Sequence, residues 1–471
     1  MHFAAPTSKA VPIHFVTKEN WEAVKAALPA TARAFAFSCR FEAKPGRCLA
    51  LPDAEGGVAA ALFGLEGAEA PRDPLLPGKL VGALPAGVYR FANAPHDASL
   101  AALAFLLASY RFTRYREAKG PLPELIAPES VDAGRLERIA AAVAFGRDLV
   151  NTPANDLGPE ALERAATKLA KKFGAKVRVI RGDDLLKRNF PLIHAVGRAA
   201  GEPPRLIDFS HGRVDAPKVT LVGKGVTFDT GGLDIKPASG MELMKKDMGG
   251  AAVALALARM IMASSLDLRL RVLIPIVENS ISATAFRPGD ILRSRKGLTV
   301  EIGNTDAEGR LILADALALA DEEAATLMFD FATLTGAARV ALGPDLPPFY
   351  TDDEALAADI ARVSAQTGDP VWRLPLWRPY DSMLDGKISD LNNSPSSPFA
   401  GSITAALFLK RFVAKSTAWA HFDVYAWNPK ARASGPEGGE IQAARALFAL
   451  LEERFGASSG ADGRAGKAKR R

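Results

Sequence analysis

Cysteine and histidine are scarce in this sequence. Cys39 and Cys48 are the only cysteines among 471 residues. They are too few for a disulfide framework, so a reducing compartment such as the cytoplasm is expected. The six histidines are scattered and form no HExxH pair, which argues against the common single-zinc protease site. No GxSxG nucleophile elbow follows a strand and no GxxxxGK[ST] loop occurs, so a serine nucleophile and P-loop phosphate chemistry are not expected.

Long apolar runs and an export signal are also missing. No stretch of eighteen consecutive apolar residues occurs, so we expect no membrane span. The first residues, MHFAAPTSKAVPIHFV, lack the basic start, apolar block and small-residue cleavage site of a secretory signal. We therefore expect a cytoplasmic protein.

Excess positive charge is confined mainly to the C-terminus. The formal net charge is +6, and residues 457–471 contain five basic residues and one acidic residue. Such a Gly/Ala/Lys/Arg-rich segment cannot bury enough apolar surface to fold, so we predict a disordered basic tail. The body is nearly neutral, and nucleic acid is not an expected partner. Weak contact of the tail with a polyanion is the alternative.

The length and the segment pattern predict an α/β protein of two domains. A chain of 471 residues exceeds the size at which one hydrophobic core stops growing. We predict a small N-terminal α/β domain over residues 1–130 and a connecting helix over 131–150, after a Pro-rich stretch. Residues 151–456 form the larger domain. Within residues 1–130, the apolar run AFAFSC and a helical segment over 99–117 carry no clustered acids.

In the larger domain, helix-like segments alternate with apolar strands. This alternation predicts a mainly parallel sheet sandwiched by helices, with functional groups beyond the strand ends. The candidate strands are VRVIRG, RLIDFSH, KVTLVGKGV, RVLIPIVENS, LTVEIG, ATLMFDF and AHFDVYAW.

Charged residues gather in three segments, each where an apolar strand gives way to a turn or a Gly-rich helix start. In LVGKGVTFDTGGLDIK, Lys224 and Asp229 lie on or just after a very apolar strand, and Lys236 follows a double glycine. A buried lysine without a compensating group would be costly. In MELMKKDMGGAA, Asp247 precedes the glycines that open an apolar helix. A helix cap is the simpler explanation for that aspartate alone.

The third segment is NTDAEGRL, which follows the strand LTVEIG. If it is extended, Asp306, Glu308 and Arg310 share one face, because side chains at i, i+2 and i+4 of a strand point the same way. An ion-pair network could explain each segment singly. Four converging carboxylates would repel one another, whereas two divalent cations roughly 3.5–4 Å apart would absorb that charge and activate water. Oxygen-rich ligands suit Mn, Mg or Zn, without choosing among them.

These motifs resemble those of the leucyl aminopeptidase family, also called cytosol aminopeptidases. NTDAEGRL matches the family's signature octapeptide, and VGKG, FDTGG, DIK and MKKDMGGAA follow its order and spacing. The likeness covers roughly residues 145–430. It implies a two-metal aminopeptidase that cleaves residues from the free N-termini of peptides, with leucine-like residues preferred.

The resemblance also implies residue roles. One metal, the tighter, would be held by Lys224, Asp229, Asp247 and Glu308, and the more exchangeable one by Asp229, Asp306 and Glu308. For Lys224 to coordinate, burial and the cation must lower its pKa until the amine is neutral. Lys236 corresponds to the catalytic lysine that polarises the scissile carbonyl. Arg310 corresponds to the arginine that holds a bicarbonate ion acting as general base. The metals would be Mn or Zn, with Mg or Co as alternatives.

The same resemblance implies a substrate pocket and an oligomeric assembly. Met244, Thr333 and Gly336 would line an apolar side-chain pocket, although ordinary core packing is the alternative for them. A homohexamer is implied. Asp234 departs from the neutral residue of many relatives, and we expect it to alter the pKa of Lys236 or to pair with a basic neighbour.

Two other function classes remain. One is a hexameric DNA-binding or architectural relative with little catalysis, which a missing ligand or a basic stripe on the folded body would favour. The other is a metal-dependent hydrolase of another class, such as a phosphatase, since two-metal carboxylate sites also serve that chemistry.

Overall fold

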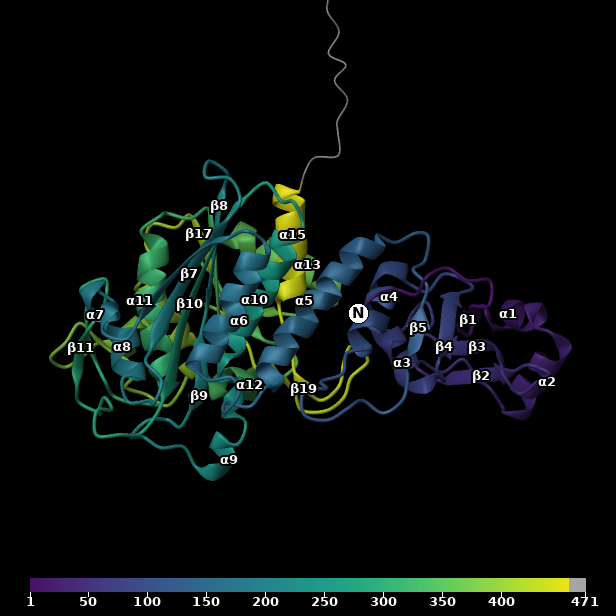
Figure 1. The fold of residues 1–471 in the computed structure, drawn as a ribbon, viewed down its shortest axis with the longest axis horizontal. Helices are drawn as coiled ribbons and strands as arrows, with labels where there is room; N and C mark the ends of the chain where they lie inside the picture. Colours follow the sequence, from purple (N-terminus) through teal and green to yellow (C-terminus); the bar gives the residue numbers. More distant parts are fainter. Residues whose placement is uncertain (457–471) are drawn as a thin grey trace, which may run out of the picture.

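The computed structural model describes residues 1–456. The predicted basic tail, residues 457–471, lies outside the described residues. Figure 1 shows a smaller N-terminal part, coloured purple, beside a larger part built around a long sheet. Neither Cys39 nor Cys48 forms a disulfide. None of the helices within residues 1–456 combines the length and the apolar character that crossing a membrane requires.

The N-terminal part is a five-stranded sheet with helices, in the strand order β2-β3-β1-β4-β5. The neighbouring pairs β1–β3, β1–β4 and β4–β5 are parallel, and β2–β3 is antiparallel. Its strands are β1 (Val11–Val16), β2 (Cys48–Pro52), β3 (Val58–Gly64), β4 (Gly87–Phe91) and β5 (Pro123–Leu125). Its helices are α1 (Trp21–Ala27), α2 (Ala30–Ser38), η1 (Leu76–Lys79), α3 (Leu80–Ala83) and α4 (Ala98–Ala108).

Two details of this part were not foreseen. The run AFAFSC belongs to helix α2 as far as Ser38, and the helix expected over 99–117 ends at Ala108. Residues 111–117, RFTRYRE, contain four charged side chains. They therefore offer no continuous apolar face to bury, and the helix stops where its buried stretch stops.

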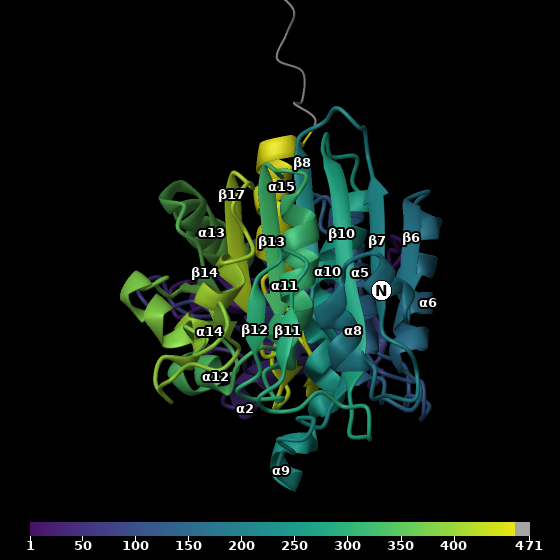
Figure 2. The same ribbon diagram turned by 90° about the vertical axis from the view of Figure 1, so that its left-hand side faces the viewer.

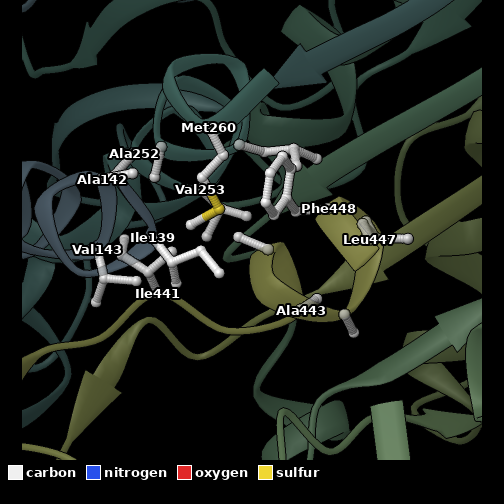
Figure 3. Packing of buried hydrophobic residues seen from close by; sticks show 14 of the residues in the cluster. Ile139, Ala142, Val143, Ala252, Val253, Met260, Ile441, Ala443, Leu447 and Phe448 are labelled. Atoms are coloured by element: carbon white, nitrogen blue, oxygen red, sulfur yellow. The ribbon is translucent and has the colours of Figure 1, made fainter. Parts of the chain in front are cut away.

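Helix α5 (Ala133–Asn151) connects the two parts and packs against both. It contacts α4 on one side and α10 (Gly249–Met262) on the other. Figure 3 shows Ile139, Ala142 and Val143 of α5 packed near Ala252 and Val253 of α10. These contacts are buried and apolar, so they contribute hydrophobic stabilisation across the connection.

The larger part is built on a nine-stranded sheet in the order β15-β14-β17-β13-β8-β10-β7-β6, with β9 paired to β10. Neighbours from β17 through β13 and β8 to β10 are parallel, and so is the pair β14–β15, while the pairs β10–β7, β7–β6 and β14–β17 are antiparallel. The expectation of a mainly parallel sheet is confirmed. The strands are β6 (Lys176–Arg181), β7 (Arg205–His211), β8 (Lys218–Gly223), β9 (Gly225–Asp229), β10 (Arg269–Asn279), β13 (Leu327–Ala332), β14 (Pro348–Tyr350), β15 (Trp372–Arg373) and β17 (Ala418–Asp423).

Helices cover both faces of this sheet, as Figure 2 shows. One apolar cluster joins the sheet to α5, α6, α10, α13 and α15, and a second joins it to α8, α11 and α14. Because both faces are covered, the central strands are continuously apolar, and all six residues of β13 are buried. The bounds are α6 (Pro159–Lys172), α7 (Asp184–Lys187), α8 (Pro191–Gly197), α11 (Glu308–Asp321), α13 (Glu354–Thr367), α14 (Gly401–Lys410) and α15 (Ala444–Phe455).

The remaining helices and strands of the larger part are short and lie outside the main sheet. The segment LTVEIG contributes β12 to a separate three-stranded sheet, β11-β12-β16, rather than to the main one. These elements are β11 (Ile291–Arg293), β12 (Thr299–Glu301), β16 (Leu391–Asn392), β18 (Trp427–Asn428), β19 (Gly438–Gly439), α9 (Ala238–Met241), η2 (Met244–Met248), α12 (Gly336–Leu342) and η3 (Arg378–Leu384).

Candidate active site

The predicted site residues meet at the carboxyl ends of the central strands. Asp229 ends β9, Thr333 follows β13, and Lys224 lies between β8 and β9. The carboxyl ends of parallel strands form one edge of a sheet, where α/β proteins bind ligands. A cavity of about 490 Å³ opens there.

Lys224 is held in the interior by its backbone and by a glycine. Its N–H donates to the carbonyl of Phe331 at 2.9 Å, and its carbonyl accepts from Ala251 N–H at 2.8 Å. A Cβ at Gly309 would lie 2.6 Å from Cε of Lys224. The absence of a side chain at position 309 therefore makes room for the lysine.

The ammonium of Lys224 stands among carboxylates. Its Nζ lies 2.8 Å from Asp247 Oδ2 and 2.9 Å from Glu308 Oε1. Burial alone would lower the pKa of Lys224, but the negative charges of Asp247 and Glu308 outweigh it and raise that pKa. Without a metal, Lys224 is thus a charged counter-ion. The neutral amine expected from the resemblance requires a cation to take over that role.

The helix-cap explanation for Asp247 does not hold. Asp247 lies in η2. The N-cap position of α10 is occupied by Met248, and no side chain caps the backbone N–H groups there. Instead, Oδ1 of Asp247 accepts a hydrogen bond from the Thr333 hydroxyl at 2.7 Å. Its other oxygen faces Lys224, so the carboxylate points into the site.

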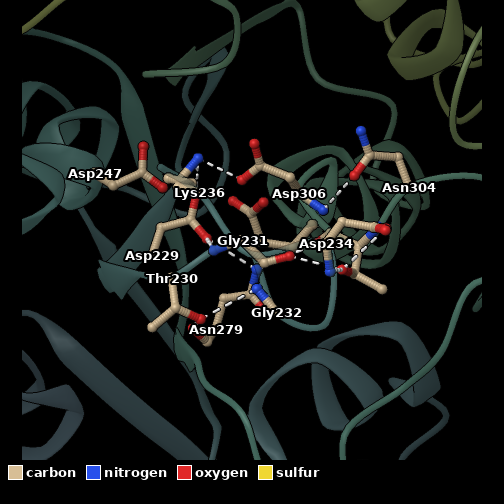
Figure 4. Close-up of polar contacts among 12 residues, drawn as sticks. Asp229, Thr230, Gly231, Gly232, Asp234, Lys236, Asp247, Asn279, Asn304 and Asp306 are labelled. Atoms are coloured by element: carbon tan, nitrogen blue, oxygen red, sulfur yellow. Dashed lines mark hydrogen bonds and ion pairs between the residues drawn. The ribbon is translucent and has the colours of Figure 1, made fainter. Parts of the chain in front are cut away.

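Three carboxylates converge beside the two lysines. Oxygens of Asp229, Asp306 and Glu308 all lie within 4.8 Å of one another. Lys236 Nζ is 2.9 Å from Asp229 Oδ2 and also contacts Asp306, as Figure 4 shows. Residues from three separate segments of the sequence therefore share one pocket.

The segment NTDAEGRL is not extended, which corrects the expected geometry. Asp306 lies in a turn, and Glu308 and Arg310 belong to the first turn of α11. The Asn304 side chain accepts from the Asp306 N–H at 2.7 Å and stabilises that turn. Positions i and i+2 of a helix do not face each other. Arg310 accordingly reaches sideways to the carbonyl of Asn393, at 2.6 Å, while still lining the cavity.

The crowding of acids makes two of them keep their protons to a higher pH than usual. Burial and the neighbouring Asp229 charge raise the pKa of Glu308 to about 8 and that of Asp306 to about 6. Within residues 1–456, Asp247 Oδ2 and Glu308 Oε1 are buried beside the Lys224 ammonium and accept no well-aligned hydrogen bond. Buried carboxylate oxygens short of donors are the ligands that hard or borderline divalent cations take. The donor set therefore fits metal ions.

Arg310 has a hydrogen-bond donor without a partner among the described residues, and it lines the same cavity. Burial lowers its pKa to about 10 although Glu308 and Asp423 favour the charged form, so the guanidinium is charged at neutral pH. Its Nε is buried without a partner among the described residues. An anion would satisfy that donor.

The predicted pocket residues Met244, Thr333 and Gly336 all line the cavity. A Cβ at Gly336 would meet no atom within 4 Å, so space is open beside it. Thr333 also positions Asp247 through the hydroxyl contact described above. Thr333 therefore has a structural role in addition to its place on the cavity wall.

Asp234 acts differently from either expectation. Its Oδ2 accepts from the backbone N–H of Thr305 at 2.7 Å and from the Thr305 hydroxyl at 3.2 Å. It forms no ion pair with a basic residue in the part of the chain that the structure describes, and its charge is not among the main influences on the pKa of Lys236. Asp234 therefore fastens the glycine turn to the NTDAEGRL segment.

Two asparagines of the site were missed in the sequence. Asn279 donates to Asp229 Oδ1 at 2.8 Å and to the Thr305 carbonyl at 3.1 Å. Asn393 accepts from the N–H groups of Gly303 and Asn304. Asn279 ends an apolar strand, β10, as Asp229 ends β9. That shared position was an available signal for Asn279, whereas Asn393 lies in a polar loop that gave none.

Comparison with known proteins shows to which family the chain is similar. The family model described as "Cytosol aminopeptidase family, catalytic domain" matches residues 144–448, and "M17 aminopeptidase, N-terminal domain" matches 11–128. A probable cytosol aminopeptidase of Syntrophotalea carbinolica is 42% identical over 366 residues, covering 74% of this chain and 73% of the relative. One of Rhodococcus opacus is 41% identical over 379 residues, covering 76% and 74%.

Solved structures agree over almost the whole chain. The cytosol aminopeptidase of Coxiella burnetii superposes with a TM-score of 0.91 at 44% identity, covering 96% of this chain and 98% of that one. The bottromycin maturation enzyme BotP in complex with Mn gives a TM-score of 0.86 at 34% identity, covering 95% and 100%. The chain therefore belongs to the cytosol aminopeptidase family and is a hydrolase of the metallo-exopeptidase type.

Proposed function

We propose that this aminopeptidase removes residues one at a time from free N-termini of peptides, with leucine-like residues preferred, and that it uses two divalent metal ions. The observation that carries the proposal is the meeting of Asp229, Asp306 and Glu308 oxygens within 4.8 Å of one another, beside two lysines. Such a cluster is stable only when positive charge compensates it.

Lys224, Asp229, Asp247 and Glu308 would hold one ion, and Asp229, Asp306 and Glu308 the other. The contacts of Lys224 with Asp247 and Glu308 support the first set, since a cation there would replace its ammonium charge. Bound ions would supply Lewis-acid chemistry, lowering the pKa of a water molecule and offsetting negative charge on the carbonyl oxygen. Mn or Zn is proposed, with Mg or Co as alternatives, and the Mn in the BotP structure favours Mn.

Lys236 would stabilise the charge that develops on the scissile carbonyl. Burial lowers the pKa of Lys236, but the Asp229 charge outweighs that effect, so the amine stays an ammonium. It lines the cavity and is held by Asp229 and Asp306. A donor already fixed in this way stabilises an oxyanion without reorganising during the reaction.

Arg310 would hold a bicarbonate ion that serves as general base. Its buried Nε lacks a partner among residues 1–456, while its Nη1 is anchored to the Asn393 carbonyl. The guanidinium is therefore oriented before an anion arrives. Met244, Thr333 and Gly336 would receive the first side chain of the peptide.

The assembly is proposed to be a homohexamer and the location cytoplasmic, both from the family resemblance. The DNA-binding or architectural alternative is less well supported, because every expected metal ligand, Lys236 and Arg310 meet at one cavity. The phosphatase alternative is less well supported for the same reason and because the chain belongs to an aminopeptidase family.

The proposal is tested with purified protein, Mn or Zn, and a set of anilide substrates. Leucyl- and methionyl-anilide should be cleaved faster than arginyl-anilide, and N-acetyl-leucyl-anilide should not be cleaved. Cleavage of the acetylated substrate at the leucyl rate would contradict exopeptidase action, and activity that survives complete removal of metal would contradict the metal role.

A further inference from the structure

Lys246 is a buried cation without an anionic partner on the cavity wall. Its residue is 6% exposed, and it lines the cavity that holds the site. Across residues 1–456, no hydrogen bond or ion pair of its ammonium is found, and the Tyr425 ring lies beneath it at 4.5 Å. A buried charge without a counter-ion is costly. An anion that binds in the cavity would therefore stabilise the buried charge of Lys246.

The acids near Lys246 are engaged elsewhere. Asp247 contacts Lys224 and Thr333. Asp423 accepts hydrogen bonds from the Leu334 N–H, the Thr335 N–H and the Thr335 hydroxyl. The positive charge of Lys246 thus remains unpaired in the described part of the chain.

A second cation lies on the same aromatic ring. The Arg339 guanidinium is 5.3 Å from the centre of the Tyr425 ring and donates to its hydroxyl at 3.2 Å. Arg339 also lines the cavity. Lys246, Tyr425 and Arg339 together form a patch, called here the cationic wall.

The cationic wall adjoins the proposed side-chain pocket. Met244 and Lys246 belong to the same short helix η2, and Gly336 begins α12, the helix that carries Arg339. All four residues line one cavity, with open space beside Gly336. A side chain that enters beside Met244 and Gly336 therefore shares the cavity with the positive charges of Lys246 and Arg339.

We infer that the cationic wall makes this pocket accept acidic N-terminal residues, glutamate and aspartate, in addition to leucine-like ones. The methylene groups of glutamate would pack against Met244, and its carboxylate would pair with Lys246. A charge-assisted hydrogen bond in a buried place is stronger than one at the surface. This inference rests on the proposed function and names a substrate class for its pocket.

The test compares kcat/KM for glutamyl-, glutaminyl- and leucyl-anilide in the metal-loaded enzyme. Glutamine has the shape of glutamate without the charge, and anilides carry no C-terminal carboxylate that could occupy the wall instead. We expect the wild type to prefer glutamyl- over glutaminyl-anilide. Lys246→Met should lower that preference by roughly tenfold or more, the effect of losing a close charge pair, and Lys246→Arg should largely retain it.

Lys245→Met is the matched control. Lys245 is the adjacent lysine of η2, but its Nζ donates to the Asn151 carbonyl at 2.9 Å and lies over Trp427, outside this cavity. Its glutamyl-to-glutaminyl preference should equal that of the wild type. Arg339→Met changes an exposed residue and guards against misfolding of the buried variant. It should lower the preference less than Lys246→Met does.

The inference is overturned if the wild type cleaves glutaminyl-anilide as well as glutamyl-anilide. It is also overturned if neither Lys246→Met nor Arg339→Met changes the ratio. Cleavage of leucyl-anilide in the same experiment separates this failure from failure of the proposed function. A wild type that cleaves none of the three substrates overturns both.

Discussion

At the scale of single residues, the two lysines of the site differ in depth and neighbours. Lys224 is buried between Asp247 and Glu308, whereas Lys236 is partly exposed to the cavity and contacts Asp229 and Asp306. Removing Lys236 leaves all the carboxylates in the pocket. Removing Asp229 takes away an oxygen shared by both proposed ion sites. The two changes should therefore have different consequences.

Lys236→Ala should keep its metal content while kcat falls by roughly 10²–10³-fold, the usual cost of losing a preorganised oxyanion donor. Asp229→Ala, in contrast, should lose metal as well as activity. Steady-state kinetics with leucyl-anilide and elemental analysis of the dialysed proteins separate the two outcomes. Wild-type activity in either variant would refute the roles assigned to these residues.

Glu308 and Asp306 make metal affinity depend on pH. With pKa values of about 8 and about 6, both carboxyls carry protons below pH 6, and Glu308 still carries one between pH 6 and 8. Ligands must lose their protons before they bind metal. The apparent affinity for Mn should therefore rise by at least about tenfold from pH 6 to 7, because Glu308 loses its proton and Lys224 must lose one to coordinate, and less steeply above pH 8, where Glu308 is already ionised. Calorimetric titration of the metal-free protein checks this, and an affinity independent of pH from 6 to 8 would contradict the protonated cluster.

At the scale of elements, the site depends on close packing of α10 against the strand ends. Gly250, in the first turn of α10, has no room for a side chain, because a Cβ there would lie 2.1 Å from the Phe331 carbonyl oxygen. That backbone oxygen cannot move without disturbing β13. The glycine thus sets the distance between the helix and the sheet, and with it the position of Asp247.

Gly250→Ala should lower the free energy of unfolding by about 1–3 kcal/mol, the usual effect of overpacking. Gly82→Ala is the control, since Gly82 is also helical but a Cβ there would meet nothing within 4 Å. That change should be neutral or raise stability by up to about 1 kcal/mol, as Gly-to-Ala changes in helices do. Urea unfolding of both variants gives the comparison. Equal stabilities would show that α10 does not pack this closely.

Prediction from sequence succeeded where the pattern was local. The apolar runs of β8, β10 and β13 predict buried parallel strands, and the charged residues that follow such strands indicate a functional site. It failed over NTDAEGRL, where the Asn304 side chain stabilises a turn and Asn393, almost ninety positions away in the chain, binds the backbone at Gly303 and Asn304. No spacing within the octapeptide reveals that distant partner.

Lys245 and Lys246 illustrate the same limit. They are adjacent and chemically identical, yet one lies over Trp427 and the other over Tyr425, inside the active-site cavity. Their surroundings come from a segment some 180 residues later. Only the fold distinguishes them, and the sequence alone supplied no reason to single out Lys246.

At the scale of the whole molecule, the site belongs to the larger part alone. The residues that line the cavity run from Lys224 to Tyr425, and none comes from the N-terminal sheet. That sheet is joined to the larger part through α4 and α5, and a Cβ at Gly78 of η1 would collide with the Ala433 carbonyl oxygen. The N-terminal part thus packs closely on the other one without entering the chemistry.

The most direct measurement of the central claim is anomalous diffraction at the manganese edge from crystals soaked in Mn²⁺. We predict two strong peaks in the pocket, one bordered by Lys224 and Asp247, the other by Asp306, with Asp229 and Glu308 touching both. In Asp229→Ala crystals at least one peak should vanish. Manganese found only on the outer surface, or a pocket that shows no manganese peak in saturating Mn²⁺, would contradict the two-metal account.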